Sequence, residues 1–403
     1  MKVLLYIGSG CFIEAAGGAE KVLCNMANEL TLRGHQVTVV CNDIKQGVPF
    51  YPLMKEVDLV NLDGSGRKKQ YPQSKKIVRE LTRPLRKTVL APLFPDPVKR
   101  QYIQEFAASF RPVVCNTEPD VIISYFLGDH DRVVQIIGHD RPLIVMHHSN
   151  SVLLLKHDHS ILASLRHCDC LQLLLPSFEK IIQKTLPHVK TTVIPNVVVS
   201  VCDEETANPG KSKDEYVITM LARLNKDKQQ DFLIRAFSHL AKEYPQWKVR
   251  FYGGIPVPPR YDDYLNTLIQ ELDLTNQVFL MGTTDKPLDV LRESDIFAFP
   301  SLFEGFPLAL TEAMSAGLPC VGLKTATAVN ELIVDGYNGF LSDNDEFDFA
   351  QKLKRLMDDP QLRVTLGQNW REFVKQFEPK KIWDQWENLI VEVVQQYGQR
   401  KAS

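Results

Sequence analysis

Short apolar runs alternate with amphipathic stretches along most of the chain. In the first half we expect six strands, each a run rich in β-branched and other apolar residues, at 2–8, 36–41, 57–62, 120–126, 142–147 and 170–175. The stretch at 19–34 carries apolar residues at helical spacing and should end at Gly34. Strands that alternate with helices are typical of parallel α/β folds.

The same pattern restarts in the second half of the chain. Six further strands are expected at 216–223, 248–253, 277–282, 295–300, 318–323 and 338–342. Between the halves, residues 200–215 are polar, contain a Pro-Gly step and show no periodicity, as in a linker. Since 403 residues exceed the usual size of one hydrophobic core, we predict two doubly wound, Rossmann-like α/β domains. Residues 379–403 should form a long terminal helix.

Composition narrows the function classes. Lys and Arg (47) nearly balance Asp and Glu (49), so the chain as a whole gives no reason to expect a nucleic-acid partner. The eight cysteines are scattered without a CxxC pair, which favours reduced thiols in a cytoplasm. In the sequence His167-Cys168-Asp169-Cys170 we expect the start of a strand rather than a metal site. There is neither a signal-peptide pattern at the beginning nor a run of about 18 apolar residues, so we expect a cytoplasmic protein.

The most informative stretch is residues 295–323. A strand should end at Pro300, a turn should follow, and a helix should run from about Leu308 to Gly317. Glu304 then lies in the strand-to-helix loop and Glu312 lies within the helix. Such loops line the crevice at the carboxyl ends of parallel strands, where ligands bind. A helix start suits a phosphate and carboxylates suit sugar or ribose hydroxyls, although two such glutamates are also common on solvated helix faces.

Two basic residues point to the same edge of the second domain. Arg223 and Lys228 follow an expected strand and precede an expected helix. A diphosphate leaving group needs its charge neutralised by a metal or by fixed cations. No Asp-x-Asp motif stands at a strand end, so we expect the two basic side chains to replace a metal and no cofactor to be required.

The loop after the first strand carries a second glycine-rich element. Gly17 and Gly18 immediately precede an expected helix and would let the backbone approach a phosphate or a sugar. An alternative is a dinucleotide fingerprint made of Gly8 and Gly10 with Asp43 after the second strand. This match is partial, because Ile13 stands where the third glycine belongs.

Taken together, these motifs resemble glycosyltransferase family 4, the retaining glycosyltransferases of GT-B fold, also described as glycosyl transferases group 1. The resemblance covers essentially the whole chain and is strongest from 216 to 342. Its marks are GGAE at 17–20, IPN at 194–196, LARLNKDK at 221–228, the Glu304 and Glu312 pair within PSLFEGFPLALTEAMSAGLP at 300–319, GYNGFL at 336–341 and FEPKKIWDQW at 377–386. Each mark is modest, but their order along one chain is specific.

The resemblance implies an architecture and a set of roles. Residues 1–199 would form the acceptor-side domain and 200–378 the nucleotide-sugar domain, facing across a central cleft, with the helix 379–403 crossing back to the first domain. Arg223 and Lys228 would bind the pyrophosphate and Glu312 the ribose. The transferred sugar would be held by Glu304, the backbone of Gly305, Phe306, Pro307 and Leu308, and His147 or its neighbour His148. Gly17 and Gly18 would approach the donor phosphates, and the backbone at Gly282 and Thr283 would recognise the base.

Two positions depart from the family pattern. Val197 replaces the usual glycine after IPN, which affects the linker backbone rather than the chemistry. The usual second-domain glycine motif reads Gly253-Gly254-Ile255-Pro256 here and continues into the proline-rich VPPR, so contacts in that loop should differ. Neither change removes a charged site residue.

The resemblance also implies a reaction. A UDP-sugar, or alternatively a GDP-sugar, would donate its sugar to a saccharide or lipid-linked glycan, as in the synthesis of cell-surface polysaccharide or lipopolysaccharide. Retention without an evident carboxylate nucleophile fits attack on the face from which the nucleotide departs. The alternatives are a nucleotide-sugar epimerase-like enzyme, a dinucleotide oxidoreductase and a non-catalytic partner subunit of GT-B fold.

One segment of the first domain is strongly basic. Residues 67–100 contain eleven basic residues, namely Arg67, Lys68, Lys69, Lys75, Lys76, Arg79, Arg83, Arg86, Lys87, Lys99 and Arg100. Only Glu80 and Asp96 oppose them, while the whole chain carries a net charge of −2. Apolar residues are interleaved at Ile77, Val78, Leu81, Leu85, Val89, Leu90, Leu93 and Phe94. This mixture suits peripheral contact with an anionic membrane on its inner face, although a solvated loop is the plain alternative.

Overall fold

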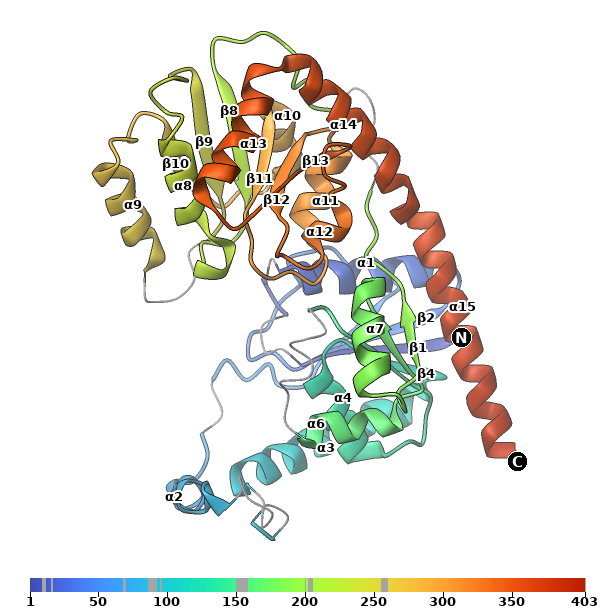
Figure 1. Ribbon diagram of the computed structural model, residues 1–403. Coiled ribbons are helices and arrows are strands. Elements are labelled where there is room, and N and C mark those ends of the chain that lie inside the picture. Colours follow the sequence, from blue (N-terminus) through green and yellow to red (C-terminus); the bar gives the residue numbers. More distant parts are fainter. Residues whose placement is uncertain are drawn as a thin grey trace. The chain divides into compact units, whose positions relative to one another are not determined.

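The computed structural model describes residues 1–8, 12–15, 17–67, 70–85, 93–94, 96–149, 159–199, 201, 206–254 and 260–402. The chain forms two compact units (Figure 1). The first contains Met1–Ile194 and Gln385–Ser403, and the second contains Pro195–Asp384. Several residues of interest lie outside the described ranges, namely Gly10, Lys68, Lys69, Arg86, Lys87, Val89, Leu90, Ile255, Pro256 and the stretch 257–259.

The first unit is built on a seven-stranded sheet in the order β3-β2-β1-β4-β5-β6-β7, in which every neighbouring pair is parallel. The six expected strands are confirmed, and the three-residue β7 was not predicted because it is too short to show a periodicity. The strands are β1 (Lys2–Ile7), β2 (Gln36–Cys41), β3 (Asp58–Asn61), β4 (Val121–Ser124), β5 (Leu143–Met146), β6 (Cys170–Leu173) and β7 (Thr191–Val193).

Helices cover the faces of this sheet. One face packs on the aromatic rings of Phe106 and Phe110, whose centroids both lie 5.3 Å from the ring of Tyr6 on β1. Strands buried on both faces explain why the runs in the sequence are almost continuously apolar. The helices are α1 (Gly18–Leu32), α2 (Gln73–Thr82), α3 (Pro97–Thr117), α4 (Leu127–Ile137), α6 (His159–Ser164), α7 (Pro176–Thr185) and the short η3 (Leu165–His167).

The second unit repeats the plan with six parallel strands in the order β10-β9-β8-β11-β12-β13. They are β8 (Tyr216–Leu221), β9 (Trp247–Tyr252), β10 (Val278–Gly282), β11 (Ile296–Phe299), β12 (Cys320–Leu323) and β13 (Gly339–Ser342), all at expected positions. The helical elements are η5 (Lys226–Lys228), α8 (Gln230–Ser238), α9 (Tyr261–Glu271), α10 (Pro287–Glu293), α11 (Leu308–Ser315), α12 (Val329–Leu332), α13 (Glu346–Asp358), α14 (Pro360–Val374) and η6 (Lys375–Phe377).

The boundary between the units falls a few residues from the one expected from the sequence. Residues 195–199 go with the second unit. The amide of Val198 donates to the carbonyl oxygen of Phe377 at 2.9 Å, and the hydroxyl of Ser315 donates to the carbonyl oxygen of Val199 at 2.6 Å. These bonds attach the linker to helices of the second unit, which the polar composition of 200–215 could not show.

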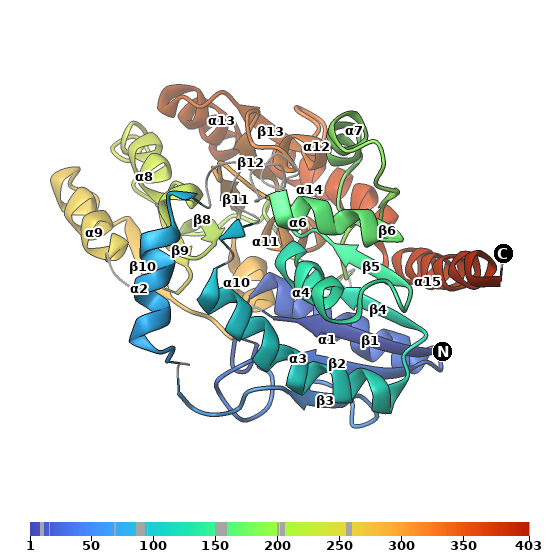
Figure 2. The same ribbon diagram turned by 90° about the horizontal axis from the view of Figure 1, so that it is seen from below.

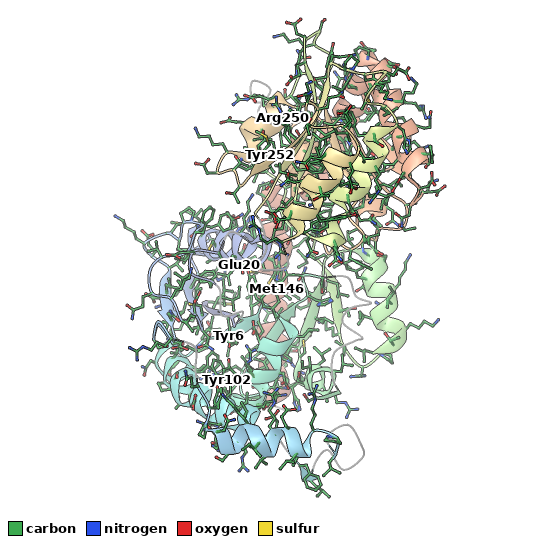
Figure 3. All side chains as sticks on the ribbon, turned by 90° about the vertical axis from the view of Figure 1, so that its left-hand side faces the viewer. Tyr6, Glu20, Tyr102, Met146, Arg250 and Tyr252 are labelled. Atoms are coloured by element: carbon green, nitrogen blue, oxygen red, sulfur yellow. The ribbon has the colours of Figure 1, made fainter. Side chains whose placement is uncertain are left out.

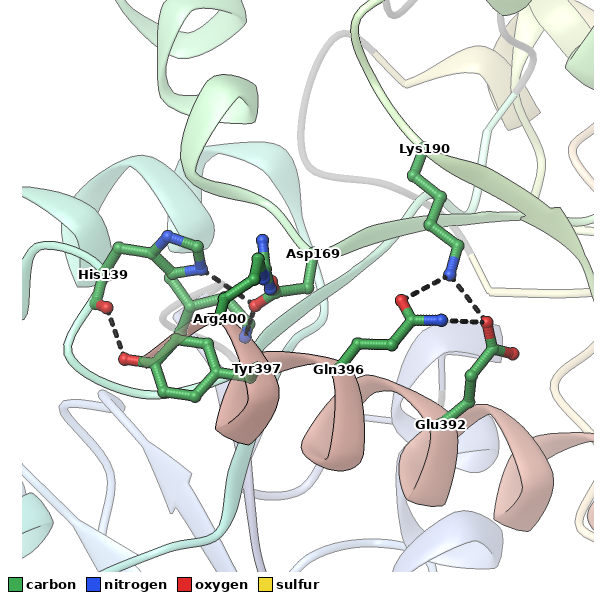
Figure 4. A network of polar contacts seen from close by, with 8 residues as sticks. His139, Asp169, Lys190, Glu392, Gln396, Tyr397 and Arg400 are labelled. Carbon is green, nitrogen blue, oxygen red and sulfur yellow. Dashed lines mark hydrogen bonds and ion pairs between the residues drawn. The ribbon is translucent and has the colours of Figure 1, made fainter. Parts of the chain in front are cut away.

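The terminal helix α15 (Pro379–Ala402) is held on the first unit by its second half (Figure 4). The hydroxyl of Tyr397 donates to the carbonyl oxygen of His139 at 2.6 Å. Arg400 pairs with the carboxylate of Asp169, whose other oxygen lies 2.9 Å from Nε2 of His139. Lys190 reaches Glu392 at 2.8 Å. Cys170 opens β6, so the sequence around Asp169 is the start of a strand, as expected.

None of the helices in the described ranges combines the length and the apolar character needed to span a bilayer.

Candidate functional site

The loops at the carboxyl ends of four neighbouring strands in the second unit are joined into one row. The amide of Gly253, after β9, donates to the carbonyl oxygen of Gly282, at the end of β10, at 2.8 Å. The amide of Leu224, after β8, donates to the carbonyl oxygen of Gly254 at 3.1 Å. The amide of Leu302, after β11, donates to the carbonyl oxygen of Asp227 at 2.9 Å. The predicted site residues of this unit therefore lie along one edge of its sheet.

Glycine is required within this row. A Cβ at Gly253 would lie 1.9 Å from the carbonyl oxygen of Ala222, a backbone atom that cannot move aside. Gly282 has φ +75°, in the left-handed region that favours glycine. The altered glycine motif in this chain thus keeps the one glycine that the packing of β8 against β9 demands.

Lys228 and Glu304 meet, although they are 76 residues apart in the sequence. The ammonium Nζ of Lys228 lies 2.5 Å from Oε1 of Glu304 and 3.4 Å from the hydroxyl of Ser301. The two charged side chains are only 18% and 12% exposed, so solvent screens their attraction weakly. The carboxylate thereby fixes the position of the cation while leaving it further N–H donors for a ligand.

The short element η5 explains why Lys228 takes this position. The side chain of Asn225 caps it by accepting a hydrogen bond from the amide of Asp227 at 3.2 Å. Gln229 then adopts a left-handed conformation, with φ 54°, and turns the chain into α8. Sequence reasoning missed the role of Asn225, although an asparagine directly before a helical turn is a known capping signal.

Arg223 stands in the same row with its side chain exposed. Its carbonyl oxygen accepts a hydrogen bond from the side-chain amide of the buried Gln230 at 2.9 Å, which fixes the backbone. Within the described ranges, the guanidinium of Arg223 forms neither an ion pair nor a hydrogen bond. Its five N–H donors are therefore available to an anion.

Helix α11 begins in the loop that carries Glu304. Pro307 is its N-cap residue and no side chain caps the helix. Phe306 is buried and its ring contacts that of Phe377 edge-on, with centroids 5.4 Å apart, which anchors the loop. Gly305 and Leu308 flank these two residues, and the half-buried Glu312 follows within the helix.

A pocket of about 520 Å³ opens between β10 and α9 of the second unit. Backbone from the row of loops contributes to its wall, and the lining includes Leu224, Gly253, Asn266, Met281 and Gly282. Its volume lies within the range of small-molecule sites. Two residues of this region were predicted to contact the base. Gly282 lines the pocket, and Thr283 is the next residue in the sequence.

The first unit places its predicted site residues at the carboxyl ends of β1 and β5. Gly17 is the N-cap of α1 and Gly18 is the first residue of that helix. His147 directly follows β5, its side chain is 4% exposed, and its Nε2 lies 3.4 Å from the hydroxyl of Ser149.

The neighbouring His148 has a different environment. Its ring stacks on that of Tyr125, with centroids 5.2 Å apart. Burial lowers the pKa of His148 to about 3, with a smaller contribution from the nearby His147. The ring is thus neutral and packs against two aromatic side chains of the first unit, those of Tyr125 and Phe126.

Both oxygens of the Asp43 carboxylate accept hydrogen bonds from backbone amides. Its Oδ2 accepts from the amide of Ile13 at 2.7 Å and its Oδ1 from the amide of Lys45 at 2.9 Å. The residue is 1% exposed. The dinucleotide interpretation required this carboxylate to bind a ribose, and that interpretation therefore loses its only acidic residue.

Comparison with known proteins identifies both halves of the chain. The family model described as Glycosyltransferase Family 4 matches residues 16–199, and the model described as Glycosyl transferases group 1 matches residues 202–373. An uncharacterised glycosyltransferase of Haemophilus influenzae is 25% identical over 94% of this chain and 97% of its own length. A UDP-Gal:α-D-GlcNAc-diphosphoundecaprenol α-1,3-galactosyltransferase of Escherichia coli is 27% identical over 51% of this chain and 55% of its own length. Other curated relatives are matched over about a fifth to a half of their length.

Solved structures show the same fold. Sucrose-phosphate synthase of Thermosynechococcus elongatus superposes with a TM-score of 0.74 at 18% identity, covering 100% of this chain and 99% of that one. HepE of Anabaena, solved in complex with UDP and glucose, gives a TM-score of 0.65 at 18% identity, with coverage of 100% and 99%. Two parallel Rossmann-like units, the row of loops that holds Lys228 and Glu304, and the two family models matched in order together show that the protein belongs to the family 4 glycosyltransferases of GT-B fold.

Proposed function

We propose that this protein transfers a sugar from a nucleoside diphosphate sugar, with a UDP-sugar favoured over a GDP-sugar, to a saccharide or lipid-linked glycan. Transfer retains the anomeric configuration and needs no metal. The observation that carries the proposal is the pairing of Lys228 with Glu304, beside Arg223, whose guanidinium has no partner among the described residues. The E. coli relative acts on a UDP-sugar and a lipid diphosphate, and HepE binds UDP, which supports both halves of the proposal.

Donor binding follows from the chemistry of the row of loops. The pyrophosphate lies on Arg223 and Lys228, two fixed cations that take the place of a metal. The backbone amides at the start of α11, from Leu308 onward, add the positive end of a helix dipole. Glu304 accepts hydroxyl hydrogen bonds from the sugar with the oxygen that Lys228 leaves available, and Glu312 accepts those of the ribose.

The base occupies the pocket beside β10. The backbone at Gly282 and Thr283 forms hydrogen bonds with the edge of the base. The left-handed conformation of Gly282 leaves open space where a Cβ would stand. Small-molecule pockets combine a mainly apolar lining with a few placed polar groups, and backbone N–H and C=O groups are among these.

Transfer requires the bond from the anomeric carbon to the diphosphate to break as the acceptor oxygen bonds on the same face. The acceptor proton passes to the departing phosphate oxygen, so no carboxylate nucleophile is needed. Negative charge grows on the diphosphate in the transition state. Each of the two cations would stabilise it by about 2–4 kcal/mol.

His147 is the histidine that faces the donor sugar in this proposal. The ring of its neighbour His148 is instead stacked on that of Tyr125. His147 directly follows β5 at the carboxyl end of the sheet, close to Ser149, where ligands of doubly wound folds bind.

The acceptor side includes a membrane contact through α2, which lies away from the sheet of the first unit in both Figure 1 and Figure 2. Ile77, Val78 and Leu81 form an apolar stripe and are 52%, 47% and 73% exposed. Two of its basic side chains bind within the unit, since Lys75 donates to Gln101 at 2.9 Å and Arg79 pairs with Asp96 at 3.2 Å. The side chains of Lys76 and Arg83 are exposed.

A helix with its apolar stripe outward and cations along its flanks suits an anionic membrane surface. The stripe enters the headgroup region, and each flanking cation contributes about 1 kcal/mol, weakened by salt. This arrangement would hold the enzyme on the inner face of a membrane, where a lipid-linked acceptor is anchored.

Co-sedimentation with liposomes tests the membrane contact. Replacement of Ile77 and Leu81 by Ser, or of Lys75, Lys76, Arg79, Arg83 and Arg86 by Gln, should each weaken binding to anionic vesicles. Leu32→Ser is the matched control, since Leu32 is 68% exposed on α1. Equal binding to neutral and anionic vesicles, or no loss in either variant, contradicts the membrane contact.

The donor class is tested by thermal unfolding with UDP, GDP, ADP and their sugars in excess EDTA. A ligand at a hundred times its dissociation constant stabilises the protein by about 2.7 kcal/mol. We expect this effect with one nucleoside diphosphate and its sugars, and its loss in Arg223→Ala. Stabilisation only with added Mg²⁺ or Mn²⁺, or none at all, contradicts the proposal, and conversion of the sugar while still on the nucleotide identifies an epimerase instead.

A further inference from the structure

The loop between β1 and α1 begins at a glycine held by two charged side chains. The amide of Gly8 donates to Oδ2 of Asp129 at 2.9 Å, and Nη1 of Arg132 donates to the carbonyl oxygen of Gly8 at 3.3 Å. Asp129 and Arg132 also pair with each other at 2.8 Å. Both polar groups of one residue are thus clamped by a single ion pair on α4.

The clamp leaves no room for a side chain at Gly8. A Cβ there would lie 2.4 Å from Nη1 of Arg132 and 2.5 Å from both Oδ1 of Asp129 and the hydroxyl of Tyr6. Three polar groups from β1 and α4 therefore converge on this one glycine. Real Cβ atoms essentially never approach so closely, so a side chain at this position would push the ends of these three side chains aside and disturb the clamp.

Arg132 is itself held in place by its neighbours. Its guanidinium carbon lies 5.5 Å from the ring centroid of Tyr102, whose hydroxyl accepts from the side chain of Asn42 at 3.0 Å. Figure 3 shows Tyr6 and Tyr102 in the same region of the first unit. The charged and titratable groups that face Asp129 are accordingly Arg132 from α4 and Tyr6 from β1, while Tyr102 from α3 faces Arg132.

A second carboxylate holds the same loop further along. Asp43, after β2, accepts the amide of Ile13 at 2.7 Å. Asp129 and Asp43 thus fix two points of the segment that leads to Gly17 and Gly18 at the start of α1. Neither carboxylate is free to touch a substrate, since each is almost fully buried and bonded to backbone.

We propose that Asp129 and Arg132 are positioning residues for the transfer reaction, which set the loop carrying Gly17 and Gly18 by clamping the peptide groups of Gly8. The inference rests on the proposed function and on the role expected of Gly17 and Gly18, which the family resemblance assigns to the donor phosphates. Asp129 and Arg132 would act on the placement of this loop in the transition state. They would not affect the nucleotide site of the second unit.

A pH profile provides a readout that a merely structural role would not change. Burial raises the pKa of Asp129 to about 6, against the lowering effects of Arg132 and the Gly8 amide. Protonation would remove its charge and weaken the ion pair with Arg132. We expect kcat of the wild type to fall as the pH drops through about 6, and this acid limb to be absent in Asp129→Asn.

A matched control for Asp129 is Asp120, which binds the backbone at the other end of β1. Asp120 accepts the amide of Lys2 at 2.8 Å, as Asp129 accepts the amide of Gly8. Asp129→Asn and Gly8→Ala should each lower kcat at least tenfold, with the dissociation constant for UDP within twofold of the wild type. Asp120→Asn should leave kcat unchanged while lowering the unfolding temperature by as much as Asp129→Asn does.

Hydrogen exchange separates failure of this inference from failure of the proposed function. The peptide spanning residues 8–18 should exchange faster in Asp129→Asn than in Asp120→Asn, whether or not transfer is detected. Unchanged exchange overturns the clamp. Unchanged kcat in an active enzyme, or a loss of kcat matched by Asp120→Asn, overturns the positioning role, whereas a wild type that binds no nucleotide overturns the proposed function alone.

Discussion

Replacing Lys228 by Ala probes the pair on which the proposed donor site depends. The change removes the ammonium that lies 2.5 Å from Oε1 of Glu304 and leaves a carboxylate that is 12% exposed without its cation. Loss of one preorganised group that stabilises transition-state charge lowers kcat by about 10²–10³-fold, equivalent to about 2.7–4 kcal/mol. The unpaired, mostly buried carboxylate should also lower the free energy of unfolding by about 1–3 kcal/mol.

A matched lysine separates these two effects. Lys213 pairs with Asp295 at 2.9 Å in the same unit, with side chains 25% and 0% exposed, at the amino end of β11 and away from the row of loops. Lys213→Ala should lose as much stability as Lys228→Ala, or more, while kcat stays within about threefold of the wild type.

The assay is the initial rate of nucleoside diphosphate release at saturating donor, combined with urea unfolding of each variant. If Lys228→Ala keeps kcat within threefold, the leaving diphosphate does not depend on this cation. If Lys213→Ala loses activity equally, the effect of Lys228 is one of stability, and the reasoning is refuted.

Three further predictions follow from the same structure. Arg223→Ala should lower kcat by about a hundredfold without changing the unfolding midpoint, because its guanidinium has no partner within the described ranges; a matched loss of stability would contradict this. Arg400→Ala should lower the free energy of unfolding of the first unit by freeing one oxygen of the buried Asp169, as measured by urea unfolding, and an unchanged midpoint would show that the end of α15 is not held. Because burial lowers the pKa of His148 to about 3, below its unfolded value of 6.5, the unfolded state takes up the proton first as the pH falls. The wild type should thus lose about 2 kcal/mol more stability than His148→Phe between pH 7 and pH 5, and equal losses in urea titrations would contradict the burial of this ring.

The positions of the strands along the chain were predictable because parallel strands buried on both faces give continuous apolar runs. All twelve expected strands are present, and helix α11 ends where Gly317, with φ +80°, was expected to stop it. The strand β7 was not predicted, because three residues are too few to show an alternation of apolar and polar side chains. The linker at 195–199 also escaped, because its bonds to Ser315 and Phe377 join residues more than a hundred positions apart.

The site was predictable only as a set of loops. Strand-to-helix loops meet at one sheet edge by topology, so Arg223, Lys228 and Glu304 could be assigned to the same edge from the sequence. The ion pair between Lys228 and Glu304 could not, because it depends on the cap at Asn225 and the left-handed turn at Gln229. Sequence reasoning also missed Asp129 and Arg132, whose partners are backbone atoms of a distant glycine and leave no motif.

The most direct test of the central claim follows the anomeric proton of the sugar by NMR. The wild type would be incubated in excess EDTA with the nucleotide-sugar chosen by thermal unfolding and with saccharide and lipid diphosphate-linked acceptors. The account predicts release of the nucleoside diphosphate and a new glycoside of the same anomeric configuration as the donor. A product of inverted configuration, a sugar changed while still on the nucleotide, or turnover that appears only after a divalent metal is added would contradict it.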